Sequence, residues 1–120
     1  MDDPVPAPLR AFLLEHIDSV AQLEALLLLR RVGKLLPTGK VAAALYVPEP
    51  TASTELATLQ SRGLIEGGPD GWRFVPNPMV DLLAETYAKA LIPVTNIVHG
   101  NPLRLRRFAD AFRFRKDKDK

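Results

Sequence analysis

Small hydroxyl side chains recur between residues 51 and 61, in a stretch whose apolar residues follow helical spacing. If the apolar side chains of this helix face inward, Ser53, Thr54 and Thr58 lie on or beside its outer face. Hydroxyl groups in that position can hydrogen-bond to phosphates or to the edges of bases. Arg62 and Arg73 follow in the sequence, and guanidinium groups pair with phosphate. These five residues are therefore candidates for polar contacts with phosphate groups.

Basic side chains concentrate at the end of the chain. Residues 101–120 contain eight Lys and Arg against three Asp, which gives this segment a charge of +5. A helix here has an apolar stripe, made by Leu105, Phe108 and Phe112. A separate side of that helix carries arginines: Arg104, Arg107 and Arg115. Such a helix could bind phosphate, an acidic protein surface or an anionic membrane. The alternative is a docking helix with local ion pairs, Arg106 with Asp110 and Arg113 with Asp117.

Catalytic and metal chemistry have no support in the sequence. There is no Cys, which excludes disulfides, thiolate metal sites and Cys nucleophiles. His16 and His99 are the only histidines and lack metal-ligand spacing, and no Ser or Thr has a neighbouring base. The glycine-rich stretch 67–71 contains Pro69, where a phosphate-binding loop needs a free amide. We therefore predict that the protein is not an enzyme and has no cofactor or metal site.

The overall composition is that of a soluble globular domain. The 120 residues are 47% hydrophobic and 25% charged, with a net charge of +2, which excludes a wholly disordered chain and a histone-like polycation. The apolar runs, such as residues 25–29, are far shorter than the roughly 20 residues of a membrane-spanning helix. With the absence of Cys and an acidic, proline-rich N-terminus, this predicts a cytoplasmic protein without integral membrane association.

The elements that position these residues are predicted to be mostly helices. Residues 1–7 are predicted to be a disordered lead-in, and residues 117–120 a frayed tail. Helix signals cover, in chain order, residues 8–16, 19–32, 38–46, 49–62, 77–99 and 101–116. Apolar runs on both sides of the glycine-rich stretch predict a β-hairpin over residues 64–75. Pro93 predicts a kink or a break in the long helix at 77–99.

Capping residues mark the ends of several of these helices. Asp18 or Ser19 can begin the second helix, because Ser19 and Gln22 have the spacing of a capping box. Gly33 is placed to end that helix. The dipeptides Asn77-Pro78 and Asn101-Pro102 each combine an N-cap with a first-turn proline, so both begin a helix.

The stretch 38–75 resembles a winged helix-turn-helix domain. The end of its second helix and the start of the first strand read Leu56-Ala-Thr-Leu59-Gln-Ser-Arg62-Gly63-Leu64-Ile65. A glycine-rich wing and an aromatic return strand at 72–75 follow. The long flanking helices resemble the MarR-like group of small dimeric bacterial regulators, and less closely the PadR-like group. The resemblance covers roughly residues 19–98. It implies a mainly α fold with a small β-hairpin wing and flanking dimerisation helices.

The resemblance also implies a function. In winged-helix proteins the helix before the wing enters the DNA major groove, and the wing touches phosphates or the minor groove. It implies that Ser53, Thr54, Thr58 and Arg62 approach DNA, with Arg73 on the wing. The chain is accordingly expected to be a dimeric DNA-binding protein, a bacterial transcriptional regulator.

The helix predicted over residues 77–99 has a heptad-like apolar seam, made by Val80, Leu83, Tyr87, Ala90, Val94 and Ile97. Such a seam fits a homodimer interface, and a helix that packs on its own domain gives the same pattern. We expect a homodimer. The chain then divides into a winged-helix domain at 8–76 and a dimerisation and interaction region at 77–116.

The charges around the expected DNA-reading helix depart from the family pattern. Residues 41–80 contain two basic and four acidic residues, a charge of −2, although phosphate neutralisation supplies most of the affinity for DNA. The alternative is a winged-helix protein-interaction or self-assembly module that does not bind DNA strongly. An acidic middle segment and a basic tail are complementary between copies, so head-to-tail contacts could extend into filaments.

Overall fold

The computed structural model of the chain describes residues 3–107 and 109. Its elements are α1 (Ala7–His16), α2 (Val20–Val32), α3 (Thr38–Leu45), α4 (Glu49–Ser61), β1 (Ile65–Gly68), β2 (Gly71–Phe74), α5 (Pro78–Lys89) and α6 (Leu91–His99). Residues 102–107 are also helical and are called the C-terminal helix below. The predicted mainly α fold with a small β-hairpin is confirmed.

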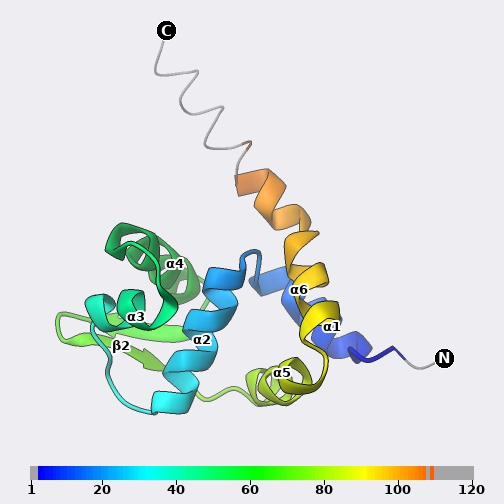
Figure 1. Cartoon of the computed structure of the whole chain (residues 1–120), viewed down its shortest axis with the longest axis horizontal. Helices are drawn as coiled ribbons and strands as arrows, with labels where there is room; N and C mark the ends of the chain where they lie inside the picture. Colours follow the sequence, from blue (N-terminus) through cyan, green and yellow to red (C-terminus); the bar gives the residue numbers. More distant parts are fainter. Residues whose placement is uncertain (1–2, 108, 110–120) are drawn as a thin grey trace, which may run out of the picture.

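Helix α2 stands in the middle of the molecule (Figure 1). Helices α3 and α4 and the hairpin lie on one side of it, and α1, α5 and α6 lie on the other. Leu23, Leu26 and Leu29 of α2 are fully buried, and Ala25 and Leu28 nearly so. A helix that is apolar around most of its circumference has to be covered on both sides, so α2 joins the two halves into one core.

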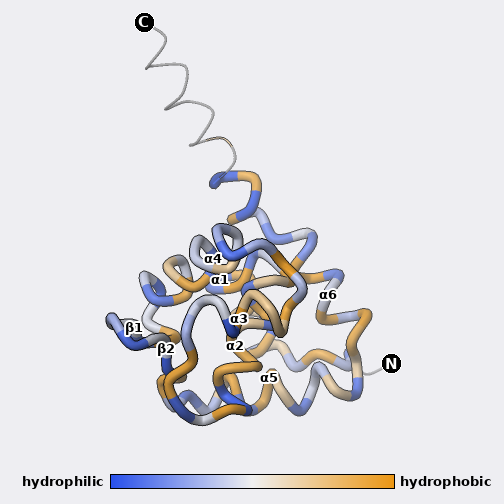
Figure 2. Tube along the Cα trace, turned by 60° about the vertical axis from the view of Figure 1, so that its left-hand side comes forward, coloured by the Kyte–Doolittle hydropathy of each residue, from blue (hydrophilic) through white to orange (hydrophobic). Residues whose placement is uncertain are grey.

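The hairpin has a third, one-residue strand beside it. β1 and β2 pair antiparallel, and Leu36 forms an isolated bridge with Trp72 on the other edge of β2. The two backbone hydrogen bonds of this bridge are both 2.9 Å long. A Cβ on Gly71 would lie 2.7 Å from the Leu36 carbonyl oxygen, so this close approach requires glycine. The order helix, short strand, helix, helix and hairpin is compatible with a winged helix-turn-helix, and Figure 2 shows hydrophilic colours at the hairpin tip.

The segment before α1 is anchored to the core. Val5 is fully buried, its backbone N–H donates to Asp3 Oδ1 at 2.9 Å, and Asp3 pairs with Arg10. The prediction of a disordered lead-in over residues 1–7 is therefore wrong for residues 3–7. Proline and aspartate dominate the composition of residues 1–7, but the buried Val5 side chain and the contacts of Asp3 hold the segment on the core. The predicted frayed tail at 117–120 lies outside the described residues.

The predicted domain boundary at residue 76 does not separate two packing units. Helix α1 packs against α5 and α6 rather than against the hairpin side of the molecule (Figure 1). Leu9 and Leu13 of α1 are fully buried in this contact region. The first helix therefore receives its apolar cover from the C-terminal half of its own chain.

The long helix predicted over residues 77–99 is two helices. Ala90 separates α5 from α6 and has non-helical dihedral angles, φ −137° and ψ 55°. Pro93 has no N–H to donate to the carbonyl of Lys89, and its ring would crowd that carbonyl in a continuous helix. The helix is therefore broken three residues before the proline. A break was one of the two outcomes predicted for Pro93, the other being a kink.

The apolar seam of that segment belongs to the core of the single chain. Val80, Leu83, Val94 and Ile97 are buried, and Ala90 lies at the break. Tyr87 is half-buried and packs against the same core. These residues therefore pack within their own domain, which was one of the two interpretations of the seam, and two helices share them. The homodimer itself stays a prediction.

Candidate functional site

The outer face of α4 is open to solvent, as the residue spacing predicts. Ala52, Leu56 and Leu59 are buried on the inner side of this helix. Ser53 and Thr54 are exposed, and Thr58 is half-buried at the edge of the face. Prolines at the N-cap and in the first turn begin the helix because neither position needs a backbone N–H donor.

Most hydroxyl groups of this face already donate a hydrogen bond along the helix. Thr54 Oγ1 donates to the carbonyl of Pro50 and Thr58 Oγ1 to that of Thr54, both at 3.0 Å. Ser61 Oγ donates to the carbonyl of Thr58 at 2.7 Å. Their oxygen lone pairs remain directed outward as acceptors. In this state the α4 face offers hydrogen-bond acceptors and small side chains, without a charge of its own.

Tyr46 is an exposed aromatic side chain in the turn before α4. It is 95% exposed and adopts φ 57° and ψ 43°, a left-handed conformation that favours glycine. Holding a tyrosine there costs conformational energy, and such residues cluster at functional sites. From the sequence, Tyr46 is only the end of a short predicted helix, and its position just before Val47-Pro48 is the one local signal of a turn.

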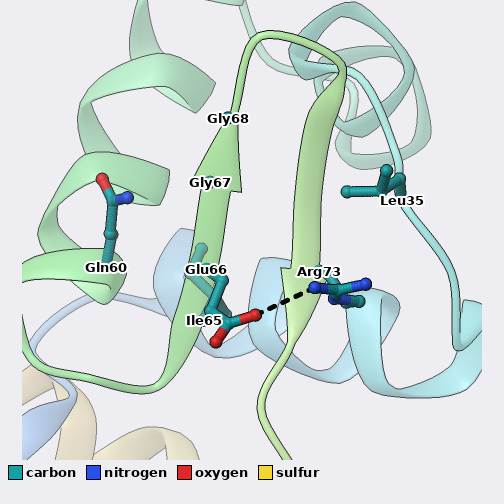
Figure 3. A pocket seen from close by; sticks show the side chains of 7 residues that line it. All are labelled: Leu35, Gln60, Ile65, Glu66, Gly67, Gly68 and Arg73. Carbon is teal, nitrogen blue, oxygen red and sulfur yellow. Dashed lines mark hydrogen bonds and ion pairs between the residues drawn. The ribbon is translucent and has the colours of Figure 1, made fainter.

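Arg73 lies on the hairpin, the position that the resemblance implies, but its positive charge is paired with a carboxylate of the same hairpin. Arg73 Nη2 pairs with Glu66 Oε2 across the two strands at 3.2 Å. Both side chains line a shallow hollow of about 460 Å³ that extends toward Gln60 and Leu35 (Figure 3). The charged groups of this hollow pair with each other, so an anion that entered it would have to displace the Glu66 carboxylate.

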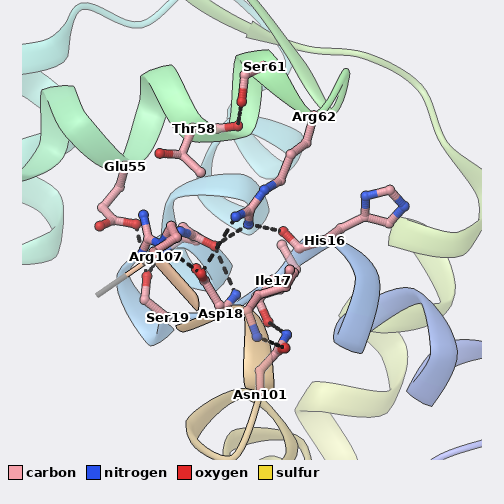
Figure 4. Close-up of polar contacts among 12 residues, drawn as sticks. His16, Ile17, Asp18, Ser19, Glu55, Thr58, Ser61, Arg62, Asn101 and Arg107 are labelled. Atoms are coloured by element: carbon pink, nitrogen blue, oxygen red, sulfur yellow. Dashed lines mark hydrogen bonds and ion pairs between the residues drawn. The ribbon is translucent and has the colours of Figure 1, made fainter. Parts of the chain in front are cut away.

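Arg62 turns away from the outer face of α4, so the structure does not place it beside the hydroxyl residues with which the resemblance groups it. Its side chain is only 16% exposed. The guanidinium donates to the carbonyl of His16 and to Gln22 Oε1, and its Nη2 lies 3.5 Å from Asp18 Oδ2 (Figure 4). The physical reason is the burial of Asp18, because a carboxylate removed from water needs a cation beside it.

A buried polar cluster thus forms where α4, the start of α2 and the C-terminal helix meet. We call Asp18, Gln22, Arg62 and Arg107 the Asp18 cluster. Asp18 is fully buried, and Arg107 Nε lies 2.7 Å from its Oδ2. Both arginine contacts to Asp18 are ion pairs without good hydrogen-bond alignment, and Gln22 Nε2 has no partner among the described residues. Figure 4 shows the two guanidiniums approaching Asp18 from different elements.

The N-terminus of α2 contributes to this cluster. Ser19 is the N-cap, and its Oγ accepts from the backbone N–H of Gln22 at 3.1 Å, which confirms the predicted cap. The Gln22 side chain in turn accepts from the backbone N–H of Asp18 at 3.0 Å. Ser19 Oγ also donates to Glu55 Oε2 of α4 at 2.9 Å. A carboxylate at the N-terminus of a helix is favoured by the helix dipole, which helps to stabilise Asp18.

Asn101 connects the two ends of the chain. It is buried, and its Nδ2 donates to the carbonyls of Leu13 at 3.0 Å and Ile17 at 2.7 Å. Its Oδ1 accepts from the backbone N–H of Leu103 at 2.9 Å, so the predicted N-cap is confirmed. The bonds to α1 were not predicted, because nothing local to Asn101 indicates a partner so far away in the sequence.

The C-terminal helix divides its arginines between inside and outside. Arg104 and Arg106 are exposed, whereas Arg107 turns into the Asp18 cluster. Arg107, predicted as part of the basic interaction surface, thus pairs with a buried carboxylate of its own chain. Leu105 is 74% exposed, so at this position the apolar stripe faces solvent. Arg115 and the expected pairs of Arg106 with Asp110 and of Arg113 with Asp117 lie outside the described residues.

The described part of the chain has neither a metal-binding cluster nor a membrane-spanning helix. It contains no group of three or more His, Cys, Asp or Glu close enough to hold a metal ion. Within residues 3–107 and 109, no helix has both the length and the apolar character to cross a bilayer. Comparison with protein-family models, with curated proteins and with solved structures gave no match.

Proposed function

We propose that this chain is a winged-helix protein that binds double-stranded DNA through the outer face of α4, in the manner of a transcriptional regulator. The observation that carries the proposal is the open outer face of a helix whose inner side is fully packed. Ser53 and Thr54 are exposed there, and small side chains allow a helix to approach a groove closely. Tyr46 adds an exposed ring and hydroxyl in the turn before that face.

The proposed binding is weak and has a shallow salt dependence. Arg62 is neutralised by Asp18, and Arg73 is opposed by Glu66, so neither supplies a free phosphate contact. Lys40 on α3 is exposed and remains available beside the proposed reading helix. Each phosphate contact adds about −0.9 to the slope of log K against log salt, and non-specific duplex binding typically has a Kd of about 10⁻⁴ to 10⁻⁶ M. We expect an affinity in that range and a slope of small magnitude.

Fluorescence anisotropy with a labelled random-sequence duplex at low salt tests the proposal. Thr54→Glu places a carboxylate on the outer face of α4, where it would repel phosphate. We expect this variant to bind at least about tenfold more weakly, a change of about 1.4 kcal/mol. Thr95→Glu is the matched control, because Thr95 also lies on a helix and donates its hydroxyl to a nearby carbonyl, that of Ile92.

Two outcomes would contradict the proposal. The first is no binding by the natural chain at concentrations up to about 10⁻⁴ M, the weak end of the non-specific range. The second is equal binding by the natural chain and by Thr54→Glu, since DNA would then contact another surface.

A second candidate function is self-association, as the predicted homodimer or a larger assembly. Leu91 and Ile92 are exposed at the start of α6. They adjoin a groove between α1 and α6 that is lined in part by Leu14, Pro93 and Asn96. Adjacent exposed apolar side chains are typical of protein interfaces. Size-exclusion chromatography with light scattering should give a dimer mass that Ile92→Glu reduces to a monomer mass; a monomer at every concentration of the natural chain contradicts this candidate.

A further inference from the structure

The C-terminal helix turns its leucine, and not its arginines, directly outward. Successive residues of a helix are about 100° apart, so Leu105 lies about 200° from Arg107, on nearly the opposite side. Arg107 points into the Asp18 cluster, and Leu105 is 74% exposed. Arg104 and Arg106 are exposed on the two flanks of Leu105. The outward side of this helix is therefore one apolar side chain between two cations.

Two attachments fix the rotation of the helix about its own axis. Asn101 holds its first turn to the end of α1, through the carbonyls of Leu13 and Ile17. Arg107 holds the next turn to the fully buried Asp18 at 2.7 Å. Since both attachments lie on the inner side, Leu105 cannot turn inward without breaking an ion pair to a buried carboxylate. Its exposure is a built-in feature of the fold.

We infer that this outward side docks on an anionic membrane surface. Leu105 enters the apolar edge of the bilayer, and Arg104 and Arg106 contact the lipid phosphates around it. At a bilayer surface apolar depth and negative charge lie side by side, which is the environment that a leucine between two arginines fits. A DNA backbone also attracts the arginines but has no apolar layer to receive the leucine.

The sequence beyond Leu105 has the same character. Phe108 and Phe112 add two further apolar residues to this part of the sequence. Residues 101–120 carry a charge of +5, and each basic residue near an anionic leaflet adds to the attraction. Apolar side chains combined with a basic segment give peripheral, reversible binding that weakens with salt. The inference goes beyond the proposed function, because it concerns the C-terminal helix and not α4.

Vesicle flotation of the full chain tests the inference. The natural chain should float with vesicles of phosphatidylcholine and phosphatidylglycerol and should stay behind with phosphatidylcholine alone. Leu105→Glu should weaken binding to the anionic vesicles at least about tenfold, because it removes the inserted apolar side chain and adds a negative charge. Leu35→Glu is the matched control: Leu35 is 45% exposed on the loop before α3, and this variant should bind like the natural chain.

Several outcomes would overturn the inference. Absence of the natural chain from the floating fraction overturns it, and so does equal flotation of Leu105→Glu. If Leu105→Glu instead lowers affinity for duplex DNA while no variant floats, the helix is a DNA-binding arm. If it instead lowers the oligomer mass without vesicles, the occupant is a second copy. Thr54→Glu separates this inference from the proposed function, since it should weaken DNA binding and leave flotation unchanged.

Discussion

The outer face of α4 and the Asp18 cluster meet at Arg62, and they differ in how far their polar groups are exposed to solvent. The α4 face keeps its hydroxyls in solvent and carries no free cation among the described residues. The Asp18 cluster buries a carboxylate and draws two guanidiniums toward it. A buried charge needs a partner far more than an exposed hydroxyl does. One buried aspartate therefore withdraws two arginines, Arg62 and Arg107, from contact with a partner molecule.

Removing the carboxylate of Asp18 should give the largest effect on stability. Asp18→Ala leaves Arg62 and Arg107 as partly buried cations without an anion, and breaking a buried pair in this way costs about 3–5 kcal/mol. We expect a loss of that size in the free energy of unfolding, measured by urea denaturation. Asp81→Ala is the control, because Asp81 also pairs with an arginine, Arg30, but in solvent, where such pairs contribute about 0–1 kcal/mol. An equal loss of unfolding free energy in the two variants would contradict the distinction between the buried pairs of Asp18 and the exposed pair of Asp81.

Asn101→Ala should give the next largest effect. It removes the amide that donates to the carbonyls of Leu13 and Ile17; Leu13 keeps its bond from the Ile17 N–H, and loss of the partner of the Ile17 carbonyl costs about 1–3 kcal/mol. Asn77→Ala is the control, since Asn77 caps α5 through one hydrogen bond to Met79 and such caps contribute about 1 kcal/mol. Thermal and urea unfolding of both variants measure the difference. A smaller loss for Asn101→Ala than for Asn77→Ala would count against the role of Asn101 in joining the chain ends.

Tyr87 is half-buried, intermediate between the exposed α4 face and the buried Asp18 cluster. Its contribution to the pH dependence of stability should be confined to alkaline pH. Its hydroxyl donates to Glu24 Oε1 at 2.8 Å, and burial, followed by the Glu24 carboxylate, raises the pKa of Tyr87 from 10.0 to about 12. Below pH 10 the folded and unfolded chains both keep this proton. As pH rises from 10 to about 12 the unfolded chain loses it first, so stability falls in that window. Urea unfolding between pH 10 and about 12 should show a smaller fall in the free energy of unfolding for Tyr87→Phe than for the natural chain. Tyr46→Phe should behave like the natural chain.

Thr54→Ala should have the smallest effect. Thr54 is exposed and its hydroxyl donates only to the carbonyl of Pro50 within its own helix. Surface substitutions of this kind change the free energy of unfolding by less than about 0.5 kcal/mol. Urea denaturation measures this directly, and a loss near that of Asn101→Ala would place the α4 face among the stabilising parts of the molecule.

Local signals were sufficient to predict most of the fold. The cap at Ser19, the left-handed Gly33 after α2, the prolines at the start of α4 and Asn77-Pro78 at the start of α5 each act within one helical turn. Pro93 likewise broke the long helix through the carbonyl four residues earlier. The hairpin was found for the same reason, because its glycine-rich turn lies between its own two strands.

The Asp18 cluster could not be predicted because its members meet only through the tertiary fold. Asp18, Arg62 and Arg107 come from three elements, and each looks like an ordinary surface residue in its own segment. The same limit applies to Leu105, since its helix has an apolar and a basic side and only the contact with Asp18 determines which side faces in. Val5 was missed because its burial depends on α1 packing against α5 and α6.

The bonds from Asn101 to α1 have a consequence for the chain during its synthesis. The carbonyls of Leu13 and Ile17 receive a partner that lies 88 and 84 residues later. At about 5–20 residues per second, translation reaches Asn101 roughly 4 to 18 seconds after it has passed Leu13. Until then the first helix lacks both this partner and its cover from α6. The bonds that Asn101 makes to the end of the first helix can therefore form only after Asn101 has been made, and a chain that stops before it should lack them.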